Sequence, residues 1–299
     1  MIKSKPLVTV VVPSYNHERY IGNCIESIIK QDYENIELII LDDGSSDNSI
    51  DIINGYVDQC RGRFLRFEFI ARANKGLSST LNEALDWAKG EFFSPIASDD
   101  EMLPHKISHQ VSEMISNPAV SACFGGVDFV DDFSNVQGNK NRSKKIYSFE
   151  DVIMRRANLM APTAMMRTEH VRDVGGYKEG IVTEDFYMWL SLSRKKGNML
   201  HCGSILSRYR VHDSNISKKK DIIWKSVEQC ILEHMDHPLF NRAYAYSLFV
   251  YAYDLQKLKD DRSRVFFKKA LAIDKGFLLS IKFLRYGFRT LFGLNMGRG

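Results

Sequence analysis

The chain of 299 residues is organised around one segment, Gly90-Glu91-Phe92-Phe93-Ser94-Pro95-Ile96-Ala97-Ser98-Asp99-Asp100-Glu101. An apolar run, typical of a strand, leads here into two adjacent carboxylates. Two carboxylates held close together repel each other unless a cation lies between them, and Mg²⁺ or Mn²⁺ binds such oxygens while keeping positions for phosphates. Ser-Asp-Asp alone is equally typical of a solvated turn, so the rest of the chain decides between a binding site and a turn.

Three further strand-like segments precede this one, and each is followed by a helical pattern. The predicted strands and helices alternate as residues 7–12, 18–31, 36–41, 49–59, 64–70 and 77–88. We expect Gly90 to close the third helix. This alternation predicts the α/β class, with a doubly wound, mostly parallel sheet and right-handed crossovers. Ligands bind such sheets beyond the carboxyl ends of the strands, where Tyr15, Asp42 and Asp99 fall.

The composition describes an ordinary globular protein and excludes several other classes. Hydrophobic residues make up 44% and charged residues 26% of the chain, and a net charge of +4 is too small to indicate nucleic-acid binding. The five cysteines are scattered, without metal-site spacing, which indicates reduced thiols in a cytoplasmic protein. Neither a signal peptide nor an apolar run of about 18 residues is recognisable.

Five motifs, in this order, resemble glycosyltransferase family 2, whose members have the GT-A fold and invert configuration. They are Pro13-Ser14-Tyr15-Asn16, Asp42-Asp43-Gly44-Ser45-Ser46-Asp47, Asn74-Lys75-Gly76, Ala88-Lys89-Gly90-Glu91 and Asp99-Asp100. The resemblance covers roughly residues 7–217. It implies a nucleotide-sugar-binding half over residues 1–103 and an acceptor-binding, catalytic half over residues 104–217. Residues 218–299 would form a helical C-terminal extension.

The resemblance assigns the first two strand ends to the nucleotide. Tyr15 would stack on the uracil ring, as aromatic side chains do on bases. Asp42 would accept a hydrogen bond from uracil N3–H, while Pro13 and Thr9 would shape the base pocket. Alternatively, Tyr15 is a half-buried core residue and Asp42 is a turn or helix-capping residue. Pro13 and Thr9 would then have only a structural role.

The resemblance also implies a divalent cation, Mn²⁺ or Mg²⁺, near the third strand end. Asp99 and Asp100 would hold the ribose and this ion. Many family members carry another acid two positions before Asp99, where this chain has Ala97, so Asp100 becomes the preferred metal ligand. An arginine common in the family is likewise replaced, by Leu81.

A second acidic pair, Glu184-Asp185, follows Thr183, a plausible helix N-cap. Acids in the first turn of a helix are favoured by its dipole, so the pair could serve only the helix. The resemblance is to the family's Glu-Asp motif, in which the aspartate is the usual catalytic base. Asp185 would therefore accept the proton of the acceptor hydroxyl, and Glu184 would act through positioning.

Ser207–Ser217 resembles the family's Tyr-Arg-x-His element, which folds over the donor diphosphate. In this chain His212 would bind the metal or the diphosphate, and Arg210 would support it. The alternative for both residues is a structural role. Between the two acidic pairs, we expect a helix over residues 104–115, a strand over residues 119–130, and a basic loop over residues 139–145 that is either simply solvated or close to an anionic substrate.

The character of the chain changes after residue 217. The sequence predicts helices over residues 222–235, 241–258 and 262–273. Residues 262–299 carry nine Lys and Arg side chains against one acid, interleaved with aromatic and aliphatic residues. This tail would either pack on the domain or lie in a membrane interface beside anionic lipid.

Taken together, the motifs predict a metal-dependent inverting hexosyltransferase. It would move a hexose from a UDP-sugar to a saccharide acceptor linked to a lipid diphosphate, in O-antigen or capsule synthesis at the inner face of the cytoplasmic membrane. The alternative is a non-catalytic nucleotide-sugar-binding protein, suggested by Ala97 and opposed by the intact Asp100, Glu184-Asp185 and His212. A nicotinamide-dependent dehydrogenase is excluded because Pro13–Tyr20 lacks Gly-x-Gly-x-x-Gly.

Overall fold

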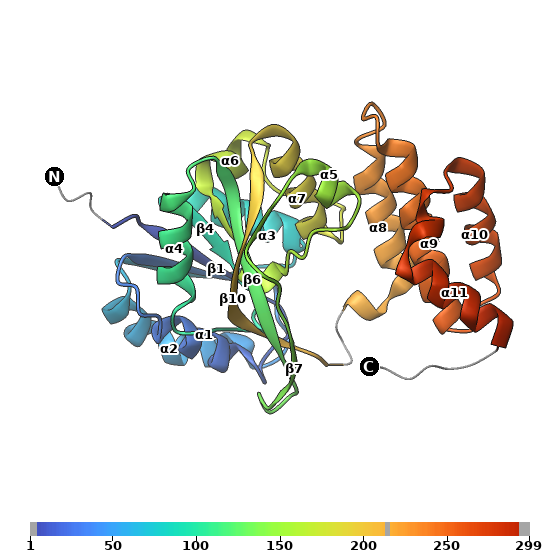
Figure 1. The fold of residues 1–299 in the computed structure, drawn as a ribbon. Helices are drawn as coiled ribbons and strands as arrows, with labels where there is room; N and C mark the ends of the chain where they lie inside the picture. The colour runs from blue at the N-terminus through green and yellow to red at the C-terminus, as the bar shows by residue number, and fades with distance from the viewer. Residues whose placement is uncertain (1–4, 213–215, 293–299) are drawn as a thin grey trace.

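A computed structural model describes residues 5–212 and 216–292 (Figure 1). Its strands are β1 (Val8–Ser14), β2 (Ile36–Asp42), β3 (Arg66–Ala71), β4 (Phe92–Pro95), β5 (Glu101–Met102), β6 (Val120–Val130), β7 (Val136–Lys140), β8 (Lys145–Tyr147), β9 (Met165–Arg167) and β10 (Asn198–Arg210). Its α-helices are α1 (Ile21–Ile29), α2 (Ser49–Arg63), α3 (Leu77–Trp87), α4 (Lys106–Ser116), α5 (Phe149–Ile153), α6 (Thr168–Asp173), α7 (Glu184–Lys195), α8 (Lys220–Leu232), α9 (Phe240–Lys257), α10 (Arg262–Ile273) and α11 (Ile281–Phe292).

The predicted α/β architecture is confirmed. The sheet has the strand order β3-β2-β1-β4-β9-β6-β10-β5, and its first four strands pair in parallel. Side chains on β1 alternate between two apolar cores: Val10 and Val12 pack with α1, α2 and α4, whereas Val11 packs with α3, α6 and α7. Helices therefore cover both faces, which explains why β1 and β2 are apolar at most of their positions.

The second half of the sheet is mixed, and sequence patterns missed part of it. β9 is antiparallel to β4 and β6, while β10 runs parallel to β6 along most of its length. No strand was predicted over β10, whose polar residues and register shifts interrupt the apolar pattern. The basic loop expected over residues 139–145 is partly strand, because β7 ends at Lys140 on β6 and β8 begins at Lys145 on β10.

Gly90 does not close α3 as expected. The helix ends at Trp87, and Gly90 is not among the residues with a positive φ angle. A Cβ atom on Gly90 would lie 2.6 Å from both the backbone nitrogen and the hydroxyl oxygen of Thr9. The glycine is therefore needed where the chain passes close to β1, before it enters β4.

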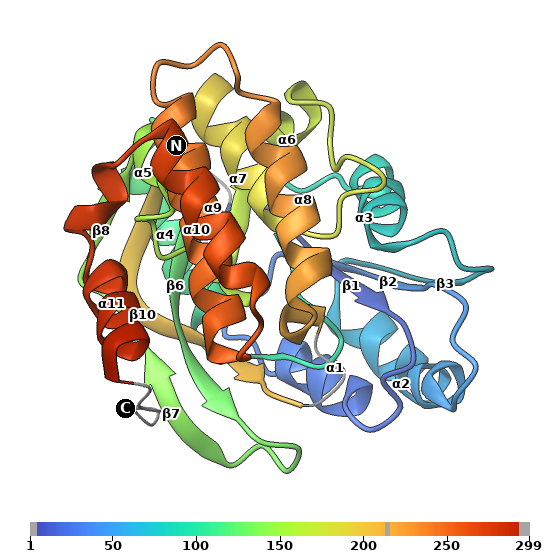
Figure 2. The same cartoon turned by 90° about the vertical axis from the view of Figure 1, so that its right-hand side faces the viewer.

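The C-terminal helices gather beside α7, away from α1 and α2 (Figures 1 and 2). They enclose an aromatic core of their own, in which Phe277 stacks on Phe249 and Tyr286 stacks on Phe267, with ring centroids 4.7 and 4.8 Å apart. The described part of the tail, residues 262–292, thus packs on α9, while Ile281 and Leu284 of α11 are 70% and 68% exposed; residues 293–299 lie outside the described residues. Among the described residues, no helix is both long and apolar enough to cross a bilayer.

Candidate active site

The carboxyl ends of β1 and β4 open into a cavity of about 540 Å³. Its lining includes most of the residues singled out by sequence: Pro13, Tyr15, Asp99, Asp100, Glu184, Asp185 and His212. These side chains come from four separate stretches of the chain, and the parallel strands bring the first two of these stretches to one edge of the sheet. The cavity therefore lies where a doubly wound sheet binds its ligands.

The two aspartates after β2 have different environments. Asp42 is fully buried, and its carboxylate accepts hydrogen bonds from Ser14 Oγ and from the backbone N–H and Oγ of Ser45 (3.0, 2.7 and 2.6 Å). It does not line the cavity, whereas Asp43 does. The burial of Asp42 therefore argues against the expected contact with a base. Its carboxylate oxygens instead hold the ends of β1 and β2 together.

Asp43 fixes the loop that carries the Asn74-Lys75-Gly76 motif. Its carboxylate accepts the backbone N–H groups of Lys75 and Gly76 at 2.8 and 2.9 Å and pairs with Arg72. Tyr15, half exposed, lines the same cavity. The sequence alone does not show whether Asp42 or Asp43 faces the cavity. The structure decides this, because β2 ends at Asp42 and Asp43 begins the loop that follows.

Three side chains form a group that fits a metal ion: His17, Asp99 and His212. One ligand atom from each lies within 4.8 Å of the other two. His212 Nε2 is 2.8 Å from Asp99 Oδ2, and Ser98 Oγ holds His17 Nδ1 at 2.7 Å. Burial lowers the pKa of His17, which favours the neutral imidazole that binds metals. His17 was missed by sequence analysis, although it lies just beyond Tyr15 in the loop after β1.

Asp100, which the sequence analysis preferred as the metal ligand, is not part of this group. It lines the cavity but is only 2% exposed, and its Oδ1 accepts the backbone N–H of Arg210 at 2.9 Å. Burial, and the neighbouring charge of Asp99, raise the pKa of Asp100 well above its usual value. Within the described chain, the three-residue group includes Asp99 and not Asp100.

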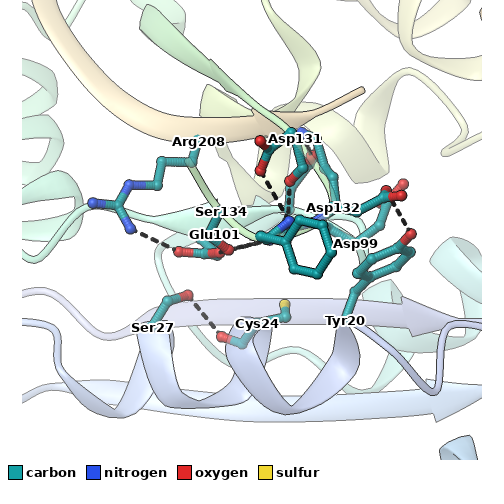
Figure 3. Close-up of polar contacts among 12 residues, drawn as sticks. Tyr20, Cys24, Ser27, Asp99, Glu101, Asp131, Asp132, Ser134 and Arg208 are labelled. Atoms are coloured by element: carbon teal, nitrogen blue, oxygen red, sulfur yellow. Dashed lines mark hydrogen bonds and ion pairs between the residues drawn. The ribbon is translucent and has the colours of Figure 1, made fainter. Parts of the chain in front are cut away.

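Arg210 does not line the cavity, contrary to expectation. Its side chain is fully buried, where it donates to Glu101 Oε1 at 2.7 Å and to the carbonyl of Asp99 at 2.9 Å. Glu101 also accepts hydrogen bonds from Arg208 and Ser134, in the cluster shown in Figure 3. Arg210 thus supports the loop that carries Asp99, rather than reaching a ligand directly.

The second acidic pair lies in the first turn of α7, as predicted. Burial and the charge of Asp185 raise the pKa of Glu184 to about 8, and burial also raises the pKa of Asp185. Thr183 occupies the N-cap position, but its side chain does not cap the helix. Instead, Ser226 Oγ on α8 accepts the Thr183 N–H at 2.8 Å, so the helical extension holds the start of α7.

A second cavity, of about 860 Å³, lies between α7 and the C-terminal helices. Glu184, Asp185, Trp189 and Tyr209 line both this cavity and the smaller one. A carboxylate at such a junction can contact two molecules, one on each side. Because general bases work best with a pKa near the working pH, a partly buried carboxylate here is suited to proton transfer.

Comparison with known proteins agrees with this arrangement. The sequence model of glycosyl transferase family 2 matches residues 9–174. A curated Escherichia coli protein, UDP-Glc:alpha-D-GlcNAc-diphosphoundecaprenol beta-1,3-glucosyltransferase WfgD, is 29% identical over 234 residues, which cover 78% of this chain and 88% of that protein.

Two solved structures share the fold at low sequence identity. S. aureus TarS in complex with UDP-GlcNAc is similar with a TM-score of 0.68 and 18% identity, covering 89% of this chain and 79% of that one. The mannosyltransferase PcManGT from Pyrobaculum calidifontis, in complex with GDP-Man and Mn²⁺, has a TM-score of 0.66 and 14% identity, covering 96% and 81%. Both similarities concern the fold alone.

Proposed function

Because the chain belongs to glycosyltransferase family 2, we propose that it moves a hexose from a UDP-sugar to a saccharide acceptor with inversion of configuration. The observation that carries this proposal is that Asp185 lines both cavities. The donor would occupy the smaller cavity, at the strand tips, and the acceptor the larger one. Asp185 would then face the acceptor hydroxyl as it approaches the anomeric carbon.

In the proposed reaction, Asp185 accepts the proton of the acceptor hydroxyl. The oxygen attacks the anomeric carbon from the side opposite the diphosphate, a new C–O bond forms, and the bond between the anomeric carbon and the phosphate oxygen breaks. Its electron pair leaves with UDP. Glu184, held protonated at neutral pH by its raised pKa, adds no second negative charge beside the base.

The donor contacts that we propose are Tyr15 against the base, Pro13 at the pocket wall, and Asp43 in place of Asp42. Asp99 and Asp100 would lie near the ribose and the diphosphate. Since Tyr15 is half exposed at the cavity, it offers a face on which a base can stack.

His17, Asp99 and His212 would hold the divalent cation, and the ion would neutralise charge on the leaving diphosphate. Mg²⁺ prefers oxygen ligands, so two imidazoles favour a transition-metal ion such as Mn²⁺ over Mg²⁺. Asp100 remains close to this group and would act through its neighbour Asp99.

A lipid-diphosphate-linked acceptor, in the synthesis of a bacterial surface polysaccharide such as an O-antigen or capsule, is the finer proposal. The E. coli relative carries diphosphoundecaprenol in the description of its acceptor. The exposed side chains of Leu279, Ile281 and Leu284 on this chain, among basic residues, would suit peripheral association with the cytoplasmic face of a membrane.

The test is a screen of UDP-sugars, measuring UDP release with Mn²⁺, with Mg²⁺ and with a chelator. We expect slow hydrolysis of one UDP-sugar, dependent on the metal, and faster release when a saccharide acceptor is added. Anomeric analysis of the product by NMR tests inversion. If the protein binds UDP-sugars but releases no UDP with any acceptor, the non-catalytic binding protein becomes the better description.

A further inference from the structure

Three cationic residues line the larger cavity: Lys75, on the loop that Asp43 holds, and Arg155 and Lys282, whose positions nothing above explains. Arg155 follows α5, and Lys282 lies on α11 in the C-terminal extension; both line the cavity. They come from segments more than a hundred residues apart in the sequence. The cavity therefore has acids at its junction with the donor site and cations contributed from both parts of the chain.

Neither Arg155 nor Lys282 has a carboxylate of the described chain in direct contact, although the charge of Asp254 acts on both of them. Among the described residues, neither the Arg155 nor the Lys282 side chain forms an ion pair, although both contact aromatic rings: Phe186 at 5.9 Å and Tyr246 at 5.6 Å from the ring centroids. Burial and the positive charge of Arg155 lower the pKa of Lys282 to about 8. The two positive charges act on each other across the cavity wall, and an anion bound between them would relieve this repulsion.

Arg155 is also held in an unusual backbone conformation, with a φ angle of +54°. The left-handed region costs a non-glycine residue free energy, and such residues are concentrated at ligand sites. Arginine is well suited to phosphate because its planar guanidinium donates two parallel hydrogen bonds. An arginine and a lysine at the wall of one cavity are thus a suitable pair for a phosphate or diphosphate.

We propose that Arg155 and Lys282 bind the phosphate or diphosphate group of the acceptor. This inference rests on the proposed function, and it assigns residues to the phosphate of the acceptor class proposed there, with the hydroxyl at Asp185 and the phosphate toward α11. It also makes the C-terminal extension part of the acceptor site. The donor diphosphate is a poorer candidate, because neither cation lines the donor cavity.

The position of Lys282 on α11 indicates where the lipid of a bound acceptor would lie. Its neighbours on α11, Ile281 and Leu284, are largely exposed to solvent. A phosphate held at Lys282 would therefore leave its lipid beside an apolar helix surface. α11 would then bind the phosphate through Lys282 and contact the lipid through Ile281 and Leu284.

The test compares two acceptors carrying the same saccharide, one as an alkyl diphosphate and one as an uncharged alkyl glycoside. The double variant Arg155→Gln, Lys282→Gln should lose on the order of tenfold or more in kcat/KM for the diphosphate acceptor, mostly through KM. It should keep wild-type kcat/KM for the uncharged glycoside and wild-type donor hydrolysis. Arg156→Gln and Arg285→Gln, exposed neighbours outside the cavity lining, are the matched controls and should change neither quantity.

Several outcomes would overturn the proposal. An unchanged preference for the diphosphate acceptor would remove these residues from its binding. A matched loss of affinity for UDP, measured by calorimetry, would assign the cations to the donor. Loss of binding to anionic vesicles, with binding of the soluble acceptor unchanged, would assign them to membrane headgroups.

Calorimetry with the alkyl diphosphate saccharide separates this inference from the proposed function. Binding to the wild type that weakens in the double variant, in a protein that releases no UDP, would support the anion site while refuting the transferase. Transfer to both acceptors with equal efficiency in the wild type would refute the anion site and leave the transferase intact. Thermal melting of each variant checks that the fold is unchanged.

Discussion

Asp185→Asn is the substitution that most directly tests the proposed chemistry. Asp185 Oδ1 accepts the backbone N–H of Phe186 at 2.6 Å, and an asparagine oxygen can accept this same bond. The variant therefore keeps the start of α7 and the shape of both cavities, while it loses the basicity of the carboxylate. Among the described residues, Phe186 is the only other residue that donates a hydrogen bond to this carboxylate, which leaves the second oxygen for a substrate.

The expected loss in transfer rate is on the order of 10²–10⁴, the range for removal of a general base. This corresponds to about 2.7–5.5 kcal/mol in the activation barrier. The assay measures UDP release at saturating donor and acceptor, so that changes in binding do not contribute. UDP affinity from calorimetry and the melting temperature should match those of the wild type.

Glu184→Gln is the matched control, because it changes the adjacent acid at the same helix end. It should reduce the rate less, since Glu184 is protonated at neutral pH and its amide analogue resembles that form. An Asp185→Asn enzyme with full activity would refute the assignment of the base. A larger loss for Glu184→Gln than for Asp185→Asn would exchange the two roles.

Three further predictions follow from the same geometry. His17→Gln should weaken Mn²⁺ binding about tenfold in direct titrations without donor, whereas the metal affinity would be unchanged if His17 only supported Ser98. Tyr15→Ala should weaken UDP binding by roughly 1–3 kcal/mol with little change in limiting rate, and unaltered UDP affinity would move the base elsewhere. Lys106→Met should raise the melting temperature, more at pH 6 than at pH 9. Burial lowers the pKa of Lys106 from 10.5 to about 7, so the wild type loses stability as the pH falls through this interval, and the full loss is present below about pH 7. An increase that is larger at pH 9 would contradict this reasoning.

Patterns in the sequence predicted the parallel half of the sheet well, and the reason is physical. β1 and β2 are buried on both faces, so nearly every residue must be apolar, and turns at their ends leave clear boundaries. β10 is different, because its 13 residues include buried polar side chains, such as His201 and Ser207, whose partners Asn158 and Pro162 lie outside the sheet. Hydrophobic periodicity cannot detect a strand whose polar groups are satisfied only by tertiary contacts.

Prediction of the site residues from the sequence was limited in the same way, because their roles depend on tertiary contacts. A motif predicts that Asp42 and Arg210 lie near the ligand, but it does not predict what their polar atoms bind. Asp42 is held by Ser14 and Ser45, and Arg210 by Glu101 and the carbonyl of Asp99. Conversely, His17 belongs to the metal-binding group only because the loop after β4 brings Asp99 beside it. Such roles depend on distances between segments far apart in the sequence.

The division of the chain between donor and acceptor has a consequence for specificity. The match to the family covers residues 9–174, which include the donor-side residues Tyr15, Asp43 and Asp99. The acidic pair, and Lys282 at the wall of the larger cavity, lie beyond that match. Ser226 on α8 also holds the backbone of Thr183 before the proposed base. We therefore expect exchange of the C-terminal extension with that of a relative to change acceptor preference and the rate of transfer, while UDP-sugar preference stays the same. A chimera that changes its donor instead would show that the two cavities are not used in this way.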